Sequence, residues 1–464
     1  MWTPRFSEKN APVYLLIADA LQNDINSGVL PAGSRLPTLK ELAQTLAVTP
    51  GTVNRAYEEA ARRGLVQGEV GRGTFVLATP ERAMESARLP HFSPSSSTQR
   101  DHIDLSVIKP EVQAQEQGIR TALEHLVASP ELGLALDYSP EGGHPAHRDA
   151  GAGWLRRFLP DVHWQQVVLT AGAQHGLLVA INALTAHQDL ILCEALCYPG
   201  IISLVHGNGR RLRGVEMDGE GIMPDSLRAL CRQEKPAMLI CVASCQNPTT
   251  AVMSNARRAE IAQIAREFDF YILDDDIYGF LTAEPVEALS SFAPERSVYL
   301  TSLSKSISPA LRIGYLHAPA ETLSRLTSMV RTSIWMPSPL IAQLASNIVT
   351  SGIGAEMLQT QKQEAAARQA IAAEVFHGLE VASQPYGYHI WVTLPEPWTS
   401  DEFANLARAQ GVNISSGTQF LAERSGHTRA VRIVLMSPTS RSELKFALTK
   451  LRSMIESSEP RLYY

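Results

Sequence analysis

The sequence predicts a large α/β domain built on a mostly parallel sheet, preceded by a small helical module that ends in a β-hairpin. From about residue 104, short apolar or β-branched runs alternate with amphipathic helical stretches, which is typical of α/β domains. Residues 1–78 instead show three short helical patterns followed by two strand-like runs. Between them, residues 79–103 are rich in Ser, Pro and charge, and a flexible linker of about 25 residues spans about 25–30 Å. We therefore expect a module over 1–78, a linker over 79–103 and the α/β domain over 104–464.

Length and composition narrow the class of protein. A chain of 464 residues exceeds one ordinary core, and 45% hydrophobic with 19% charged residues is typical of soluble globular proteins. The start has no apolar core of signal-peptide type, and no apolar run approaches the roughly 18 residues that span a bilayer. We expect a cytoplasmic protein with no membrane contact. The five cysteines form no CxxC pair, so buried reduced thiols are expected and no metal site.

Apolar residues at helical spacing predict three helices in the small module. The first ends near Gly28, the second begins with a capping box of Thr38 and Glu41, and the third begins at Thr49-Pro50. Two short helices separated by a tight turn form a helix-turn-helix pattern.

Two short strand-like runs follow the third helix and predict a wing. The runs flank Gly71-Arg72-Gly73, which places an arginine at the tip. If the third helix enters a major groove, its first residues face the bases and nearby basic residues contact phosphates. A small protein-interaction module is the alternative, but the wing disfavours it. The predicted DNA contacts are Arg35, Thr38, Lys40, Thr49, Gly51, Thr52, Asn54 and Arg72. The net charge of −6 gives this prediction no support, so it depends on the motif.

The stretches GVLPAGSRLPTLKELAQTLAVTPGTVNRAYEEAARRGLV and GRGTFV resemble the GntR superfamily of winged-helix regulators, over nearly all of residues 11–78. The resemblance implies binding to a double-stranded DNA operator. The sequence departs from the family at Pro50-Gly51, where Ser-Arg or Thr-Arg is common, so one frequent DNA-contacting arginine is missing.

In the large domain, polar residues follow the predicted strands Val167–Thr170, Leu190–Glu194, Met238–Val242, Tyr271–Asp274 and Val298–Thr301. Ligands of parallel sheets bind at such strand ends. Small residues after Thr170 open a helix that could hold a phosphate. Three adjacent carboxylates, 274–276, would repel one another unless a cation compensates them. A metal site is one possibility, but no histidine or Glu cluster accompanies it, and a protonated pyridine would serve equally well.

Lys305 follows the last of these strands within Ser302-Leu303-Ser304-Lys305-Ser306. Burial at a strand end can lower the pKa of a lysine and make it a Schiff-base amine. Together these segments resemble fold-type I pyridoxal 5′-phosphate (PLP) enzymes, the aspartate aminotransferase superfamily, over roughly residues 104–455. The stretches 387–395 and 416–420 are similar to its smaller C-terminal α+β part.

This resemblance implies a role for each matching residue. Lys305 would form the internal aldimine with PLP, Asp275 would pair with the pyridinium nitrogen, and Arg432 would bind a substrate carboxylate. The remaining cofactor contacts would be Asn247 and Tyr278 at the phenolic oxygen, Tyr198 stacked on the ring, Ala173, Gln174, Ser302, Ser304 and Arg312 at the phosphate, and Tyr138 at the phosphate of a neighbouring subunit. Departures at Leu196, His147-Arg148 and Thr250 affect loop shape more than ring chemistry.

The two halves together resemble the MocR subfamily of GntR regulators. That implies a transcription regulator in which an amino acid or amine exchanges with Lys305 through its aldimine and changes the DNA-binding state. An active aminotransferase carrying a DNA-binding arm is the second possibility, and a sensor of PLP itself is the third. Arg432 disfavours the third, because a cofactor sensor needs no carboxylate clamp. Tyr138 and the long linker predict a head-to-tail homodimer.

Overall fold

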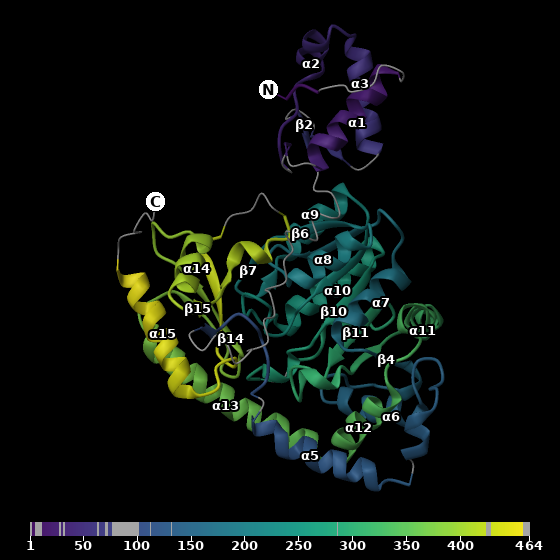
Figure 1. Cartoon of the computed structure of the whole chain (residues 1–464). Coiled ribbons are helices and arrows are strands. Elements are labelled where there is room, and N and C mark those ends of the chain that lie inside the picture. Colours follow the sequence, from purple (N-terminus) through teal and green to yellow (C-terminus); the bar gives the residue numbers. More distant parts are fainter. Residues whose placement is uncertain are drawn as a thin grey trace. The chain divides into compact units, whose positions relative to one another are not determined.

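The computed structural model describes residues 2–4, 12–26, 29–30, 33–62, 65–69, 73–76, 102–111, 113–130, 132–284, 286–423 and 428–457. The chain divides into two compact units, residues 1–87 and 88–464, whose elements are labelled in Figure 1. Of the predicted linker, residues 79–101 lie outside the described residues.

The smaller unit contains three helices and a hairpin, as predicted. The helices are α1 (Val13–Asn26), α2 (Leu39–Leu46) and α3 (Pro50–Arg62), and strands β1 (Val66–Glu69) and β2 (Gly73–Val76) pair antiparallel. The apolar stripes that predicted α1 and α3 form its core, because these residues are buried together: Ile17, Leu21, Ile25, Val53, Ala56, Tyr57 and Ala60.

A seven-stranded sheet forms the centre of the larger unit, in the order β4-β12-β11-β10-β9-β5-β6. Its strands are β4 (Val167–Thr170), β12 (Gly314–His317), β11 (Ser297–Ser302), β10 (Tyr271–Asp275), β9 (Pro236–Cys241), β5 (Leu190–Glu194) and β6 (Arg211–Val215). β12 runs antiparallel to β11 and β4, and the pairs from β11 to β6 are parallel. The mostly parallel sheet and five of its strands were predicted. The sequence did not reveal β6 and β12.

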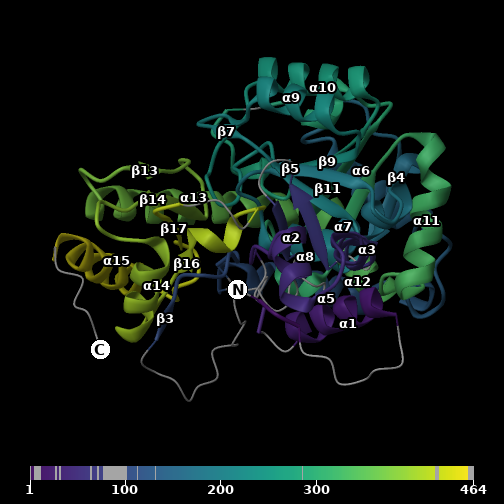
Figure 2. The ribbon, with the colours of Figure 1, turned by 90° about the horizontal axis from the view of Figure 1, so that it is seen from above.

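Helices cover both faces of this sheet, and alternate residues of its strands belong to different cores. Ile191 and Cys193 pack in the core under α7 (Ala173–Leu184), α8 (Pro199–Gly207) and α11 (Ala320–Ile334). Leu190 and Leu192 pack in the core under α9 (Pro224–Gln233) and α10 (Asn255–Phe268). Figure 2 shows α9 and α10 on one side of the sheet and α7 and α8 on the other. A third core joins α5 (Gln113–Ala128), α6 (Pro145–Leu155), α12 (Pro339–Thr350) and the start of α13 (Ile353–Val375).

The C-terminal part of this unit is a smaller α+β layer. Its antiparallel sheet has the order β13 (Val381–Ala382), β14 (His389–Thr393), β17 (Ala430–Val434) and β16 (Ser415–Ser416), and it packs with α14 (Ser400–Ala409) and α15 (Arg441–Glu456). In the main part of the larger unit, β7 (Met217–Asp218) forms a hairpin with β8 (Gly221–Ile222). β15 (Val412–Asn413) of the C-terminal layer pairs in parallel with β3 (Ile103–Asp104). Ile103, the last residue of the predicted linker, therefore already belongs to a strand.

All five cysteines are buried free thiols, as expected. Among the described residues, no helix combines the length and the apolar character needed to cross a membrane. The described ranges also contain no group of three or more His, Cys, Asp or Glu placed to hold a metal ion.

Candidate functional site

Most predicted site residues of the larger unit lie where the parallel strands of the large sheet end. β10 ends at Asp275, β11 ends at Ser302 and β5 ends at Glu194, and these strands run in the same direction. The segment with Lys305 follows β11, and Arg432 enters the site from β17 of the C-terminal layer. The site therefore lies between the carboxyl ends of the large sheet and the smaller one.

Lys305 is held by a backbone carbonyl. Its Nζ donates a hydrogen bond of 2.6 Å to the carbonyl oxygen of Ile108. Burial lowers the pKa of Lys305 to about 8, and the charges of Arg432 and Arg312 act in the same direction, while Asp275 opposes them. A lysine with such a pKa carries a substantial neutral fraction near neutral pH, which is the nucleophilic form.

Asp275 is a buried carboxylate with unused acceptor capacity. Its Oδ1 has no hydrogen-bond partner among the described residues. Burial, and then the neighbouring carboxylates Asp276 and Glu194, raise the pKa of Asp275 to about 8. A buried acceptor of this kind is costly unless a donor or a cation faces it. The residue therefore suits a protonated ring nitrogen.

The two flanking carboxylates are compensated differently. Asp274 Oδ2 accepts a hydrogen bond of 2.9 Å from the backbone N–H of Ser290, and Asp276 Oδ2 accepts one of 2.9 Å from the hydroxyl of Tyr299. The fully buried guanidinium of Arg258 lowers the pKa of both carboxyl groups against the effect of burial. The cation that compensates Asp274 and Asp276 is thus Arg258, which sequence analysis missed, whereas Asp275 is left to face a ligand. Arg258 comes from α10, and nothing in its sequence context distinguishes it from a surface arginine.

Arg432 forms a buried, preorganised guanidinium site. Its Nη1 donates to Asn247 Oδ1 (2.7 Å), and its Nη2 donates to the Ser106 carbonyl (2.5 Å) and to Ser415 Oγ (3.2 Å). Its Cζ lies 4.8 Å from the centre of the Phe420 ring. Burial lowers the pKa of Arg432 to about 10, and within the described part of the chain its Nε has no acceptor. A planar cation with an unpaired donor suits a carboxylate ligand.

The residues predicted to bind an anion at the start of α7 lie beside Arg312. Ala173 and Gln174 are the first residues of the helix, and Gly172 before them has φ +82°. This left-handed φ favours glycine, and a Cβ on Gly172 would lie 2.8 Å from Nη2 of Arg312, so the guanidinium would have to move. Arg312 donates to Ser304 Oγ (3.4 Å) and to the Ala171 carbonyl (3.3 Å). Helix dipole, backbone N–H groups and guanidinium together suit a phosphate.

Two tyrosines and a hydroxyl complete the residues that the structure brings together. Tyr198 precedes α8, and a Cβ on Gly200 would lie 2.2 Å from its ring, so the ring lies directly on the helix start. Tyr278 is buried, and burial raises its pKa above the ordinary value. Ser302 is buried at the end of β11, and its Oγ accepts from the Ser304 N–H at 3.4 Å.

Tyr138 does not join these residues within one chain. Its side chain is 74% exposed, and its ring lies 6.3 Å from that of Trp335, which is itself 56% exposed. Its role at a neighbouring subunit therefore stays a prediction.

Glu194 is a second group that sequence analysis missed. It is buried at the end of β5, and its Oε1 accepts a hydrogen bond of 2.6 Å from the Val242 N–H. Burial raises its pKa to about 7. Its position at the end of a predicted strand was a usable sign. The carbonyls of Ser106 and Ile108 were not predictable, because backbone contacts leave no trace in residue type.

In the smaller unit, the predicted DNA contacts lie mostly on the surface. Thr49, Gly51 and Asn54 are exposed and Thr52 is partly exposed at the start of α3. The hydroxyls of Thr49 and Thr52 lie 2.9 Å apart, and Asn54 Nδ2 donates to Glu58 Oε1 at 2.7 Å. The helix start borders a hollow that α1 also lines.

The other predicted contacts precede these along the chain or belong to the wing. Thr38 caps α2, with the full capping box to Glu41, so its hydroxyl is already used. Arg35 and Lys40 are exposed, and the Arg35 guanidinium lies where a Cβ on Gly73 would meet it at 2.9 Å. Arg72 lies outside the described residues.

Comparison with known proteins identifies both units. Residues 101–451 match the family of class I and II aminotransferases, and residues 13–76 match the bacterial regulatory proteins of the gntR family. The HTH-type transcriptional regulator YdeF of Bacillus subtilis is 26% identical over 98% of this chain and 97% of its own. The probable rhizopine catabolism regulatory protein MocR of Rhizobium meliloti is 24% identical over 88% of this chain and 87% of its own. An archaeal alanine:glyoxylate aminotransferase shares the fold with a TM-score of 0.73, at 21% identity, over 87% of this chain and 100% of its own.

Proposed function

Since the chain belongs to the class I and II aminotransferase family and carries a gntR-type helix-turn-helix on the same polypeptide, we propose that it is a PLP-dependent transcription regulator. It acts in the cytoplasm on operator DNA, and its aminotransferase-like unit senses an amino acid or an amine. The observation that carries this proposal is the convergence of Lys305, Asp275 and Arg432 in one site of a chain that also holds the DNA-binding module.

The residues at the sheet edge fit PLP. The unpaired, buried Oδ1 of Asp275 suits the ring nitrogen, and the start of α7 with Arg312 suits the phosphate. When bound, PLP supplies an aldehyde that condenses reversibly with primary amines. Lys305 holds the amine that this aldehyde requires, at a lowered pKa. The further residues that would hold the cofactor are Asn247, Tyr278, Tyr198, Ala173, Gln174, Ser302 and Ser304.

Arg432 supports an amino acid as effector. Its guanidinium is fixed by Asn247, Ser106 and Ser415 before any ligand arrives, so a carboxylate would find it already oriented. This also argues against a sensor of PLP alone, which would not need a buried arginine beside the cofactor site. An effector can change DNA binding only as far as it binds the two regulator states with different affinity.

The exposed start of α3 supports DNA recognition through a major groove. Thr49, Gly51, Thr52 and Asn54 would face the bases, with Arg35, Lys40 and Thr38 near the backbone. Arg72 would contact the minor groove or the backbone.

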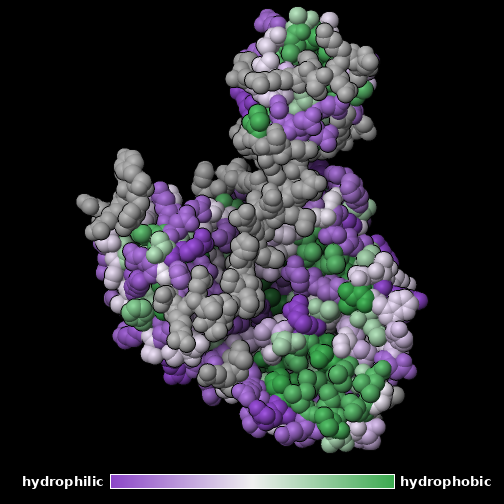
Figure 3. All heavy atoms as spheres, in the orientation of Figure 1, coloured by the Kyte–Doolittle hydropathy of each residue, from purple (hydrophilic) through white to green (hydrophobic). Residues whose placement is uncertain are grey.

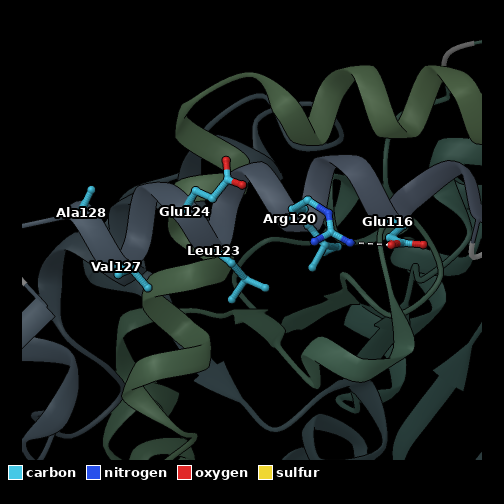
Figure 4. Close-up of a pocket in the computed structure, with 7 residues that line it drawn as sticks. Glu116, Arg120, Leu123, Glu124, Val127 and Ala128 are labelled. Atoms are coloured by element: carbon cyan, nitrogen blue, oxygen red, sulfur yellow. Dashed lines mark hydrogen bonds and ion pairs between the residues drawn. The ribbon is translucent and has the colours of Figure 1, made fainter.

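A homodimer is part of the proposal, and an apolar surface of the larger unit supports it. Figure 3 shows a broad hydrophobic area at the foot of this unit, where Figure 1 places α5, α6 and α12. On α5, the surface has a hollow, which is shown in Figure 4. Leu123 and Val127 line this hollow, and Arg120 and Glu116 beside them form an ion pair (2.7 Å). Among the described residues of this unit, the exposed large apolar side chains are Leu123, Val127, Leu136, Tyr138, Ile334, Trp335, Leu340 and Phe446. Apolar surface on this scale favours a partner, and a second copy would bring Tyr138 to the neighbouring phosphate.

An active aminotransferase is the second candidate, because Lys305, Asp275 and Arg432 are the groups that transamination requires. The regulator is preferred because it accounts for both units, whereas turnover accounts for one.

One titration separates these functions. The PLP-loaded protein is titrated with a panel of amino acids and amines while the cofactor absorbance, keto-acid formation and binding to promoter DNA are followed. We expect an effector to change the absorbance and the DNA affinity without sustained keto-acid production. Sustained conversion with an unchanged DNA affinity would establish the aminotransferase instead, and no cofactor absorbance at all would refute the PLP site.

A further inference from the structure

Residues His102–Glu111, here called the strap, run from the start of the larger unit past the candidate site. Directly before them in sequence come residues 79–101, which lead to the DNA-binding module. The strap is bound to the C-terminal layer through the N–H groups of Ile103 and Leu105, which donate to the carbonyls of Gly411 (2.8 Å) and Asn413 (2.7 Å). It is thus both part of the site and the continuation of the connecting segment.

Two carbonyls of the strap accept hydrogen bonds from the two cations of the site. Lys305 Nζ donates to the Ile108 carbonyl at 2.6 Å, and Arg432 Nη2 donates to the Ser106 carbonyl at 2.5 Å. These are the groups that would react with the cofactor and bind an effector carboxylate. Hydrogen bonds from charged donors are about twice as strong as neutral ones.

The strap is fixed on both sides of these carbonyls. Asp104 Oδ1 accepts from the N–H and the hydroxyl of Ser106 (2.9 and 2.6 Å), and Asn413 Nδ2 donates to the same oxygen at 3.2 Å. At the other end, the buried side chain of Gln361 forms hydrogen bonds of 2.9 and 2.7 Å with the backbone N–H and carbonyl of Glu111. Between these anchors the Val107 carbonyl also accepts a hydrogen bond from the Ser437 hydroxyl, so the stretch that depends on Lys305 begins at Ile108.

We propose that the strap senses whether the amine of Lys305 is free, and that it shifts between its anchors when this amine is engaged. The proposal rests on the proposed function. A free amine donates to Ile108, whereas an amine that is covalently engaged with the cofactor cannot hold the same geometry. Ile108 is buried, so a carbonyl that lost this donor would have little access to water as a replacement. An unsatisfied carbonyl there favours a shift of the strap between its anchors.

Hydrogen exchange of the full-length chain tests this inference. Amide exchange of residues 103–111 is compared in the wild type and in Lys305→Met, each without and with PLP. Methionine keeps the apolar volume and removes the donor. Without PLP, we expect exchange in Lys305→Met to be about tenfold faster than in the wild type, the factor that corresponds to one charged hydrogen bond. Lys445→Met is the matched control, because that lysine pairs with Glu374 on the surface at 2.7 Å, and exchange of the strap in this variant should equal that of the wild type.

The second comparison is the effect of PLP on exchange of the strap in the two proteins. PLP should speed exchange of the strap in the wild type relative to its effect in Lys305→Met, since only the wild type has a contact to lose. Equal exchange in both proteins without PLP would overturn the inference, and so would an equal effect of PLP in both when the cofactor absorbance shows that the wild type has bound it. The comparison without PLP remains decisive even if the wild type proves unable to bind the cofactor, so failure of the strap and failure of the PLP site give different results. Asn413→Ala removes an anchor of the strap and not a contact to the site, so it should speed exchange equally with and without PLP. An effect of this substitution that depends on PLP would also contradict the inference.

Discussion

The two units present their polar residues in opposite ways. At the start of α3, Thr49, Thr52 and Asn54 lie on the surface and are paired only with neighbours on the same helix. In the larger unit, Lys305 and Arg432 are bound within a network that reaches the strap and the C-terminal layer. Exposed pairs cost little to break, whereas buried charges are costly to leave unpaired. The DNA-binding face can therefore exchange its partners for DNA freely, while the ligand site can change only if its surroundings move.

The largest effect on stability is expected from Arg258, the buried cation that compensates Asp274 and Asp276. Arg258→Met should lower the free energy of unfolding by about 3–5 kcal/mol, because Asp274 and Asp276 lose their buried counter-charge. Urea unfolding of the full chain measures it. The surface pair of Arg266 and Glu295 gives the control, since Arg266→Met should cost less than about 1 kcal/mol. Combining Arg258→Met with Asp276→Asn should restore part of the loss, and an absence of restoration would mean that the charge is not the cause.

The next effect is a dependence of stability on pH. The pKa of Asp275 is raised from 3.8 to about 8 in the folded chain, so the folded state binds the proton more tightly than the unfolded state. Stability from this group is fully present below about pH 4 and is lost as the pH rises toward about 8. Asp275→Asn should therefore flatten the decline in unfolding free energy of the cofactor-free protein between these values. Glu194 and Asp274, with pKa values raised to about 7, would keep part of the slope. Parallel curves for both proteins would refute the raised pKa.

A smaller and more local effect is expected at the start of α8. Gly200→Ala places a methyl group 2.2 Å from the Tyr198 ring, which must then move away from the position proposed for stacking. Overpacking of this kind costs about 1–3 kcal/mol, and where this cost opposes the stacking position of the ring, the affinity for PLP falls by roughly 5- to 150-fold. Gly153→Ala in α6 is the control, because nothing lies within 4 Å of the added carbon. Fluorescence titration with PLP compares them, and equal affinities would exclude stacking by Tyr198.

The contrast between buried and exposed residues also explains which strands and site residues the sequence could predict. The five strands with apolar or β-branched runs were found because all of their residues, or nearly all, are buried. β6 (RLRGV) was missed because it lies at the sheet edge with Arg211 and Arg213 in surface ion pairs, and β12 (GYLH) was missed because it begins with a glycine and ends with a histidine. Residues at strand ends were recognisable from their type. Arg258 and the strap carbonyls were not, because their roles arise from packing between elements distant in sequence.

The smallest effects are expected on the DNA-binding face, and they separate phosphate contacts from base contacts. Lys40→Ala should weaken binding to all DNA sequences alike and reduce the slope of log affinity against log salt by about 1. Asn54→Ala should instead cost about 1–3 kcal/mol on the operator only and leave the slope unchanged. Both side chains are exposed, so neither change should alter the unfolding of the chain or its PLP absorbance. Fluorescence anisotropy with operator and random duplexes over a range of salt distinguishes them. Equal losses on both duplexes for Asn54→Ala would mean that α3 does not read the bases, and that specificity comes from the wing or from the shape of the DNA.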